Sequence, residues 1–180
     1  VYKILKKKKL WAIFYVPCQP YIYNEVLNVH KVHILTSKFR PEKILKTLHP
    51  IIKEEMLITN KIEEFNKFTY INQKNEESFN KVKKILNYFL KENLKNDVIR
   101  ELSTKLGIKN FNLKYYIDIN SIKKMHQNGM IIGSHSVTHP VMSKLSSKKQ
   151  KLELELSFRF IKCLINYDHK TYCHPFGGRY

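Results

Sequence analysis

Two histidines on a short polar segment are the side chains best suited to metal chemistry. His135 and His139 are separated by three small or uncharged residues, and Pro140 disfavours helical backbone at His139. Neutral imidazoles at this spacing can converge on one borderline metal such as Zn²⁺, which binds nitrogen at about 2.0–2.1 Å. The spacing by itself is also compatible with one buried and one exposed histidine that bind nothing.

A second segment could supply backbone donors. Pro175-Phe176-Gly177-Gly178 follows a predicted strand at residues 171–174. A proline and two glycines permit a tight turn, and the N–H groups of such a turn can point into a cleft and stabilise an oxyanion. An ordinary surface turn is the alternative.

Three predicted strands would position these segments. The apolar run at residues 10–16 stops at Pro17 and has the pattern of a strand buried on both faces. Residues 130–133 and 171–174 predict two more strands, and the loops that carry chemistry follow both. In α/β sheets ligands gather outside the carboxyl ends of the strands, so we expect the site there.

Two helices are predicted in the last third of the chain. Asn120 or Ser121 would cap a helix that ends at Gly129. Residues 147–150 form a capping-box pattern at the start of a helix that runs to about Asn166. Its expected apolar face comprises Leu152, Leu156, Phe160, Cys163 and Leu164.

The middle of the chain is different in kind. From about residue 41 to residue 107, apolar side chains recur at helical spacing, and no glycine interrupts the segment before Gly107. We therefore expect a largely helical insertion within a single partial α/β domain that spans residues 1–180.

The charge, the cysteine content and the lengths of the apolar runs argue against several classes of protein. Lys and Arg number 33 against 15 Asp and Glu, a formal charge of +18, and only four of the basic residues are arginine. Nucleic-acid readers favour arginine, so we expect a solvated basic surface and no specific nucleic acid. A basic polyanion- or RNA-binding module that uses Tyr70, Tyr88, Tyr115 and Tyr116 is the competing hypothesis. Three cysteines without metal or redox spacing indicate no disulfide framework, and no apolar run is long enough to span a membrane.

The amino-terminal residues predict the end of a basic helix. Residues 1–9 carry Val1, Ile4 and Leu5 as its expected apolar face, and no small-residue cleavage site of a signal peptide follows. The chain starts without methionine and stops at Tyr180, so both ends look cut. The compartment, cytoplasmic or envelope-associated, stays open.

Four segments together resemble a known family. Residues 134–140, Ser-His-Ser-Val-Thr-His-Pro, resemble the second motif of the polysaccharide deacetylases, the NodB-homology group of carbohydrate esterase family four. Residues 173–178 resemble the third motif, and residues 12–17 resemble the second strand of the family. Residues 29–33 resemble a subgroup associated with bacterial surface polysaccharides.

The resemblance implies an incomplete distorted (β/α) barrel of the polysaccharide deacetylase type with a largely helical insertion. It implies a hydrolase that depends on a divalent metal, most often Zn²⁺, and removes N-acetyl groups from amino sugars of a bacterial polysaccharide or its precursor. His135 and His139 would be metal ligands, and the Phe176 N–H would lie near the oxyanion. Residues expected along the substrate are His174, Pro175 and Gly177.

The family's first motif, which supplies the base and a third ligand, and its late general-acid histidine have no counterpart in residues 1–180. We therefore expect little or no turnover from these residues alone, and a catalytically inactive carbohydrate-binding relative is the alternative. His30 and His33 are expected to form a partly buried pair, and nothing in the sequence places Asp118 or Asp168 at a metal.

Overall fold

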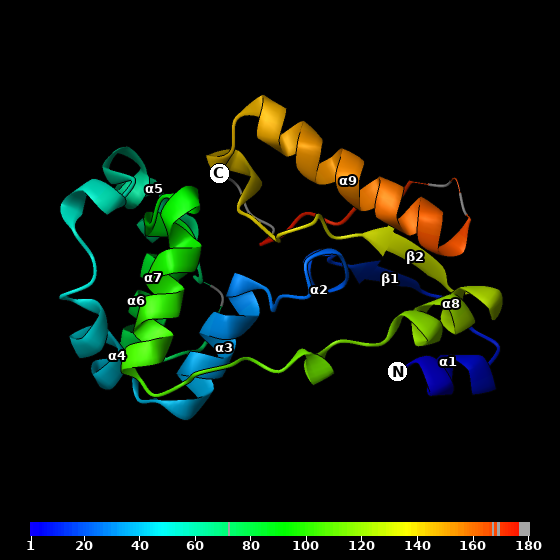
Figure 1. Ribbon diagram of the computed structural model, residues 1–180, viewed down its shortest axis with the longest axis horizontal. Coiled ribbons are helices and arrows are strands. Elements are labelled where there is room, and N and C mark those ends of the chain that lie inside the picture. Colours follow the sequence, from blue (N-terminus) through cyan, green and yellow to red (C-terminus); the bar gives the residue numbers. More distant parts are fainter. Residues whose placement is uncertain (72, 167, 169, 177–180) are drawn as a thin grey trace. The chain divides into compact units, whose positions relative to one another are not determined.

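The computed structural model describes residues 1–71, 73–166, 168 and 170–176 (Figure 1). The chain forms two compact units. The first unit combines residues 1–25 with residues 112–175, and the second contains residues 26–111 together with Phe176.

A small parallel sheet organises the first unit. Strand β1 (Ile13–Val16) pairs with β2 (Ile131–Ser134) in parallel register, with Val16 opposite Ser134. Tyr172 makes a parallel bridge to Ser134 on the far edge of β2. The predicted strand at residues 171–174 is therefore a single bridge, since backbone pairing there is limited to two hydrogen bonds with Ser134.

β1 is shorter and less buried than predicted. Leu10 and Trp11 are 52% and 67% exposed, so these apolar side chains do not extend the strand into a core. Phe14 and Val16 on one face are covered, whereas Tyr15 on the other face is exposed. The expectation of a strand buried on both faces was wrong, because the helices among the described residues of this unit cover one face of the sheet and leave Tyr15 exposed on the other.

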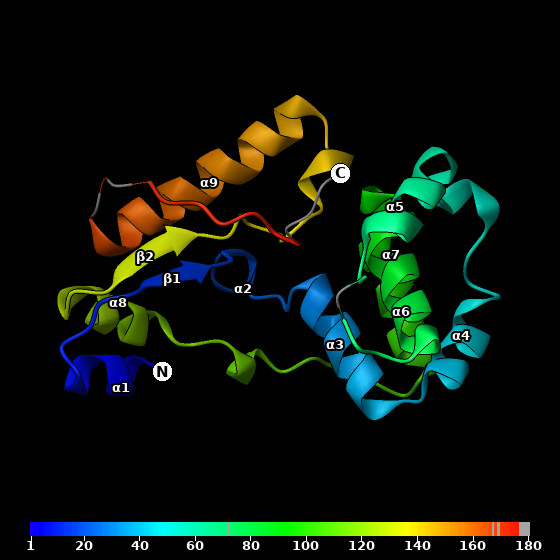
Figure 2. The ribbon, with the colours of Figure 1, turned by 180° about the vertical axis from the view of Figure 1, so that it is seen from behind.

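Helices α1 (Tyr2–Lys7), α8 (Ile119–Gln127) and α9 (Ser147–Ile165) build that covered face, and they lie beside the sheet in Figures 1 and 2. The unit also holds the short helix α2 (Gln19–Ile22) and the 3-10 turns η4 (Leu113–Tyr115) and η5 (Met142–Lys144). The core side chains are Val16, Ile122, Met125, Met130, Ile132 and Ile161.

Both predicted helices of the last third are present, but their details differ. Asp118, rather than Asn120 or Ser121, caps α8 by accepting a 2.8 Å hydrogen bond from the Ser121 N–H. The capping box of α9 does not form, because the Gln150 amide donates to the carbonyls of Met142 and Leu145.

The buried face of α9 also differs from the prediction. Ser157 and Ile161 are buried, while Leu152 is 53% exposed. In α1, Tyr2 and Leu5 pack on the core, whereas Val1 and Ile4 point to solvent. The predicted faces were right for Leu5, Phe160 and Leu164, which pack on the core, and wrong for the exposed Val1, Ile4 and Leu152. Apolar periodicity does not say which neighbour a helix meets.

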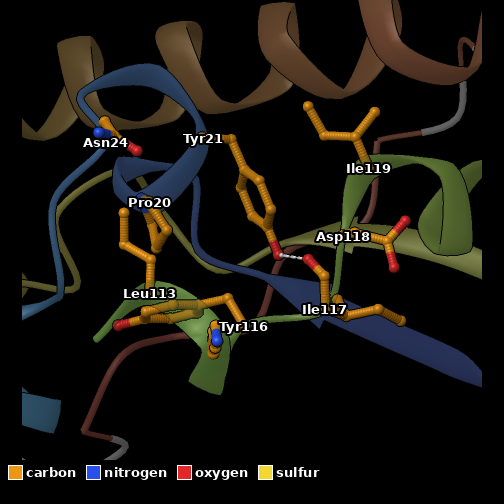
Figure 3. Close-up of a pocket in the computed structure, with 9 residues that line it drawn as sticks. Pro20, Tyr21, Asn24, Leu113, Tyr116, Ile117, Asp118 and Ile119 are labelled. Atoms are coloured by element: carbon orange, nitrogen blue, oxygen red, sulfur yellow. Dashed lines mark hydrogen bonds between the residues drawn. The ribbon is translucent and has the colours of Figure 1, made fainter.

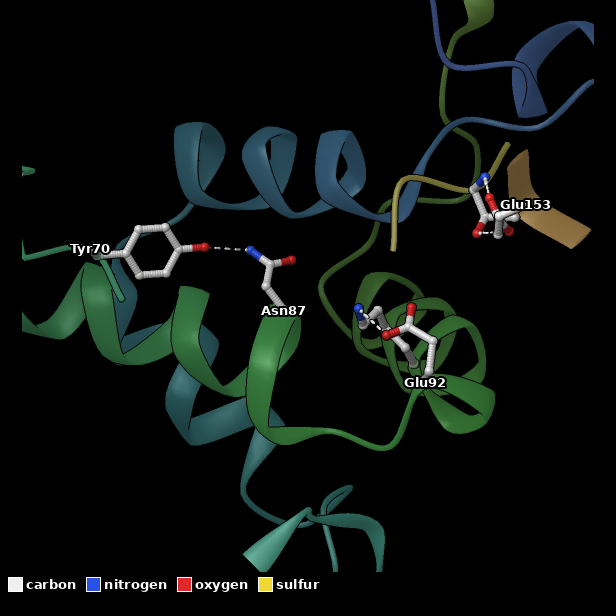
Figure 4. Close-up of polar contacts among 6 residues, drawn as sticks. Tyr70, Asn87, Glu92 and Glu153 are labelled. Atoms are coloured by element: carbon white, nitrogen blue, oxygen red, sulfur yellow. Dashed lines mark hydrogen bonds and ion pairs between the residues drawn. The ribbon is translucent and has the colours of Figure 1, made fainter. Parts of the chain in front are cut away.

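The second unit is helical, as predicted for residues 41–107. Its helices are α3 (Asn28–Lys38), α4 (Pro41–Leu48), α5 (Ile62–Phe68), α6 (Glu77–Lys84) and α7 (Glu92–Lys105). The turns η1 (Glu54–Met56) and η2 (Thr59–Lys61) and a π-helical segment η3 (Ile85–Phe89) connect them. Inside this unit the Asn87 amide donates to the Tyr70 hydroxyl at 2.9 Å (Figure 4).

The first unit has the strand–helix–strand order of an α/β fold, and residues 26–111 of the second unit lie between β1 and α8 in sequence. Within the described residues the sheet has two strands and does not close into a barrel. No helix in the described part of the chain is long and apolar enough to cross a membrane.

Candidate active site

The segment that carries His135 and His139 leaves the carboxyl end of β2 and is held against the chain that leaves β1. The His135 N–H donates to the Val16 carbonyl at 3.1 Å. In the other direction, the Cys18 and Gln19 N–H groups donate to the carbonyls of Ser136 and Val137 at 3.1 and 2.9 Å. We call residues 135–139 the histidine loop. Its position is set by backbone hydrogen bonds on both sides.

The two imidazoles meet within this loop. Their ring centres are 4.6 Å apart and their planes are inclined by 77°. Two imidazoles bound to one tetrahedral ion at about 2.0–2.1 Å would have ring centres about 5 Å apart, so the observed separation suits a shared ion.

The orientation of His135 is fixed by a backbone carbonyl. Its Nδ1 lies 2.8 Å from the Cys173 carbonyl oxygen. A carbonyl oxygen can only accept, so Nδ1 carries the proton, and in the neutral ring the lone pair is on Nε2. Metal-binding histidines are commonly oriented by this kind of contact.

The histidine loop contains backbone that most residues avoid. Ser136 and His139 have φ values of +63° and +56°. Each left-handed residue without glycine costs on the order of 1 kcal/mol, so neighbouring groups must compensate for the loop's shape. The Ser136 hydroxyl accepts from the His139 N–H at 3.1 Å, and the Ser134 hydroxyl accepts from the Ser136 N–H at 3.2 Å. Ser134 in turn contacts the Ser157 hydroxyl of α9 at 2.6 Å.

Glu153 of α9 supplies the strongest support to the loop. Its carboxylate accepts hydrogen bonds from the N–H groups of Val137 and Thr138 at 2.7 and 2.9 Å, and from the Thr138 hydroxyl at 2.7 Å (Figure 4). One side chain therefore holds two consecutive amides between the histidines, and hydrogen bonds to a charged acceptor are stronger than neutral ones.

Two further ionisable groups near the loop, Cys18 and Tyr172, stay protonated at neutral pH. Burial, aided by the negative charge of Glu153, raises the pKa of the Cys18 thiol to about 12. Burial raises the pKa of Tyr172 to about 12 as well, again with a contribution from Glu153. A thiol with such a pKa is a poor nucleophile, so the geometry does not favour covalent catalysis by Cys18.

The family model for polysaccharide deacetylase matches residues 80–180, more than half of the chain. The chain belongs to the polysaccharide deacetylase family. The match contains α8, β2, the histidine loop and α9, so it confirms the family resemblance inferred from residues 134–140 and 173–178. Residues 12–17 and 29–33 lie outside the match. No curated protein and no solved structure matched the chain.

The third-motif residues of this deacetylase family member differ from one another in exposure and in the unit to which they belong. His174 is exposed and its ring lies 5.0 Å from that of Tyr172, while Pro175 is buried. Phe176 has a φ of +65° and lies with the second unit, where its ring contacts Tyr88. Gly177 lies outside the described residues. The roles of these residues toward an oxyanion or a substrate stay predictions.

Among the described residues, no cluster of three or more His, Cys, Asp or Glu side chains occurs. These residues therefore do not provide a complete set of metal ligands. Asp118 caps α8, and Asp168 forms a 2.6 Å ion pair with Lys162. His30 and His33 lie on α3 in the second unit, with ring centres 6.1 Å apart. The role of His135 and His139 as metal ligands stays a prediction, with which their 4.6 Å ring separation is compatible.

Sequence analysis did not single out Glu153 or Ser157. Both lie on the face of α9 that is turned toward β2 and the histidine loop, together with the buried Ile161. The sequence did contain a signal for this face: Glu153, Ser157 and Ile161 are spaced four residues apart, so they share one side of a helix. It was hidden by the Leu152/Leu156/Phe160 pattern.

Proposed function

We propose that this deacetylase family member takes part in the metal-dependent removal of N-acetyl groups from amino sugars of a bacterial polysaccharide or its precursor. The observation that carries the proposal is the His135–His139 pair, with rings 4.6 Å apart at the carboxyl end of a parallel strand. The family match supports deacetylation, and zinc, the sugar and a family-type barrel around this sheet are our inferences from the site.

The chain's own residues would do three things in such a reaction. His135 and His139 would hold the metal, which when bound polarises an amide carbonyl and lowers the pKa of a water molecule. The Cys173 carbonyl keeps the His135 proton on Nδ1 and so leaves Nε2 as the ligand atom. Glu153 and Ser136 hold the backbone between the ligands in the conformation that brings the rings together.

Zinc titration of isotope-labelled protein tests the metal site directly. We expect Zn²⁺ to shift the imidazole nitrogen resonances of His135 and His139, and a His135→Ala or His139→Ala variant to bind zinc much more weakly. Loss of groups that merely orient a ligand costs about 10- to 100-fold in affinity, so loss of a ligand should cost at least as much. His126→Ala, on α8, is the matched control and should leave zinc affinity unchanged.

Activity is a separate readout. Acetate release from an N-acetylglucosamine oligomer, with and without zinc, measures deacetylation, and we expect little from residues 1–180 alone. The proposal fails if zinc leaves the His135 and His139 resonances unshifted or if all three histidine variants behave alike.

A further inference from the structure

The first unit contains a pocket that the proposed metal site does not use. It has a volume of about 530 Å³ and lies between α2 and the segment that leads into α8 (Figure 3). This volume falls within the range of about 300–1,000 Å³ typical of small-molecule sites. Apolar and aromatic side chains dominate its wall, with Asn24, Lys114 and Asp118 as polar groups.

One wall of the pocket is held rigidly by Tyr21. Its ring is stacked on Phe160 of α9, with centres 5.7 Å apart and planes inclined by 18°. Its hydroxyl donates to the Ile117 carbonyl at 2.9 Å, which joins the two sides of the pocket (Figure 3). A preorganised wall lowers the entropy cost of binding a ligand.

The polar groups suit a neutral ligand rich in hydroxyl groups. The Asp118 carboxylate is fixed by the Ser121 N–H and hydroxyl at 2.8 and 2.7 Å, and each carboxylate oxygen can accept a further hydrogen bond. Asn24 supplies both a donor and an acceptor. With one aspartate and one lysine on the lining, the pocket presents no excess of either charge. Aromatic rings beside such groups match the apolar faces and hydroxyl edges of a sugar.

The pocket is also linked to the histidine loop. Its first wall begins in α2, immediately after Cys18 and Gln19, whose N–H groups bond to the Ser136 and Val137 carbonyls. The sheet's carboxyl end is therefore shared by the loop and this wall. The backbone at residues 18–19 therefore connects the histidine loop to this wall of the pocket.

We propose that this pocket is a subsite for a neutral sugar residue of the polysaccharide, distinct from the residue that is deacetylated. The inference rests on the proposed function for the carbohydrate nature of the ligand. Tyr116 is the side chain that we expect to contact the sugar, because its ring lines the pocket on the segment that leads into α8.

Titration of isotope-labelled protein with an N-acetylglucosamine tetramer tests the subsite. We expect amide shifts at residues 113–119 and at Asn24, and a roughly tenfold loss of affinity in Tyr116→Ala, because this variant removes the aromatic ring and the apolar area that it would bury against the sugar. Tyr115→Ala is the matched control: Tyr115 is adjacent, 69% exposed and not part of the lining.

A second variant guards against a folding defect in Tyr116→Ala. Asn24 has a φ of +55°, so Asn24→Gly keeps the left-handed backbone while it removes the amide. It should also weaken binding of the tetramer. Equal affinity of wild type, Tyr116→Ala and Asn24→Gly, or shifts confined to other residues, would overturn the subsite, as would preferential binding of an anionic polysaccharide.

The His139→Ala variant separates this inference from the proposed function. The tetramer should still shift residues 113–119 in that variant, because the pocket does not contain the histidines. Zinc binding at His135 without sugar binding in the pocket would refute the subsite alone. Sugar binding in the pocket without zinc binding at the histidines would refute the proposed metal chemistry alone.

Discussion

Replacing Glu153 with alanine should loosen the histidine loop while α9 stays folded. The carboxylate accepts three hydrogen bonds from Val137 and Thr138, and each such bond to a charged group contributes about 1.5–3 kcal/mol. These contributions do not add in full. Thr138 is exposed, so water can replace Glu153 at its N–H and hydroxyl once the carboxylate is gone.

Val137 determines how much free energy of loop closure the Glu153→Ala variant loses. Val137 is only 1% exposed, so without the Glu153 carboxylate its N–H would have no acceptor and little access to water. An unsatisfied buried donor costs about 1–3 kcal/mol, and we take about 2 kcal/mol as the loss in the free energy that keeps the loop closed. This corresponds to a roughly 30-fold larger population of the open loop, since 1.4 kcal/mol is a factor of about ten in an equilibrium constant.

Amide hydrogen exchange measures this quantity directly. In Glu153→Ala the Val137 amide should exchange about 30-fold faster than in wild type, whereas amides in the middle of α9 should be unaffected. Glu153→Gln keeps an acceptor oxygen but loses the charge, so a smaller effect is expected. Zinc affinity should fall in the same order, since the loop holds both proposed ligands.

Glu155→Ala provides the control on the same helix. The Glu155 carboxylate lies 3.7 Å from the Lys151 ammonium, and both side chains are more than half exposed. Exposed pairs of this kind contribute about 0–1 kcal/mol, so Val137 exchange should not change. If Val137 exchanges at the same rate in Glu153→Ala and Glu155→Ala, the carboxylate does not hold the loop and the reasoning is wrong.

Three further predictions concern the scaffold of the first unit. A Cβ at Gly133 would lie 2.6 Å from the Tyr15 ring, so Gly133→Ala should lower the free energy of unfolding in urea by about 1–3 kcal/mol. Since burial raises the pKa of Cys18 to about 12, alkylation of the native protein at pH 8 should modify the exposed Cys163 and spare Cys18; equal labelling would contradict this. Hydrogen bonds from Ser121 to the Asp118 carboxylate lower the pKa of Asp118. The stabilising effect of Asp118 is therefore present above the pKa of an unfolded aspartate and is lost as the pH falls through the lower folded value. The difference in unfolding free energy between wild type and Asp118→Ala should shrink between pH 7 and pH 3.

Local sequence was enough to predict the chemistry-bearing loop. His135, His139 and Pro140 are close in the chain, so their types and spacing restrict what the loop can do without knowledge of the rest. The same holds for the helical character of residues 41–107 and for the start of α9, which depend on periodicity and on residues near each helix end.

The groups that hold the loop in place could not be predicted in this way. Glu153 lies on a separate helix, and its role depends on α9 packing with the 153/157/161 face toward β2. An amphipathic pattern shows that a helix has an apolar face, but the neighbours decide which side chains are buried. Leu152 is exposed for that reason, although its pattern indicated a core position.

The amino-acid sequence by itself determined the two histidines, the family motif around them and the alternation of strand and helix, because all three are local patterns. Only the tertiary structure decided the tautomer of His135, the support from Glu153 and the pocket beside α2. Each depends on contacts between residues far apart in the chain, such as His135 with Cys173 and Tyr21 with Phe160. Chain periodicity carries no information about those pairings, since they arise only when the elements pack.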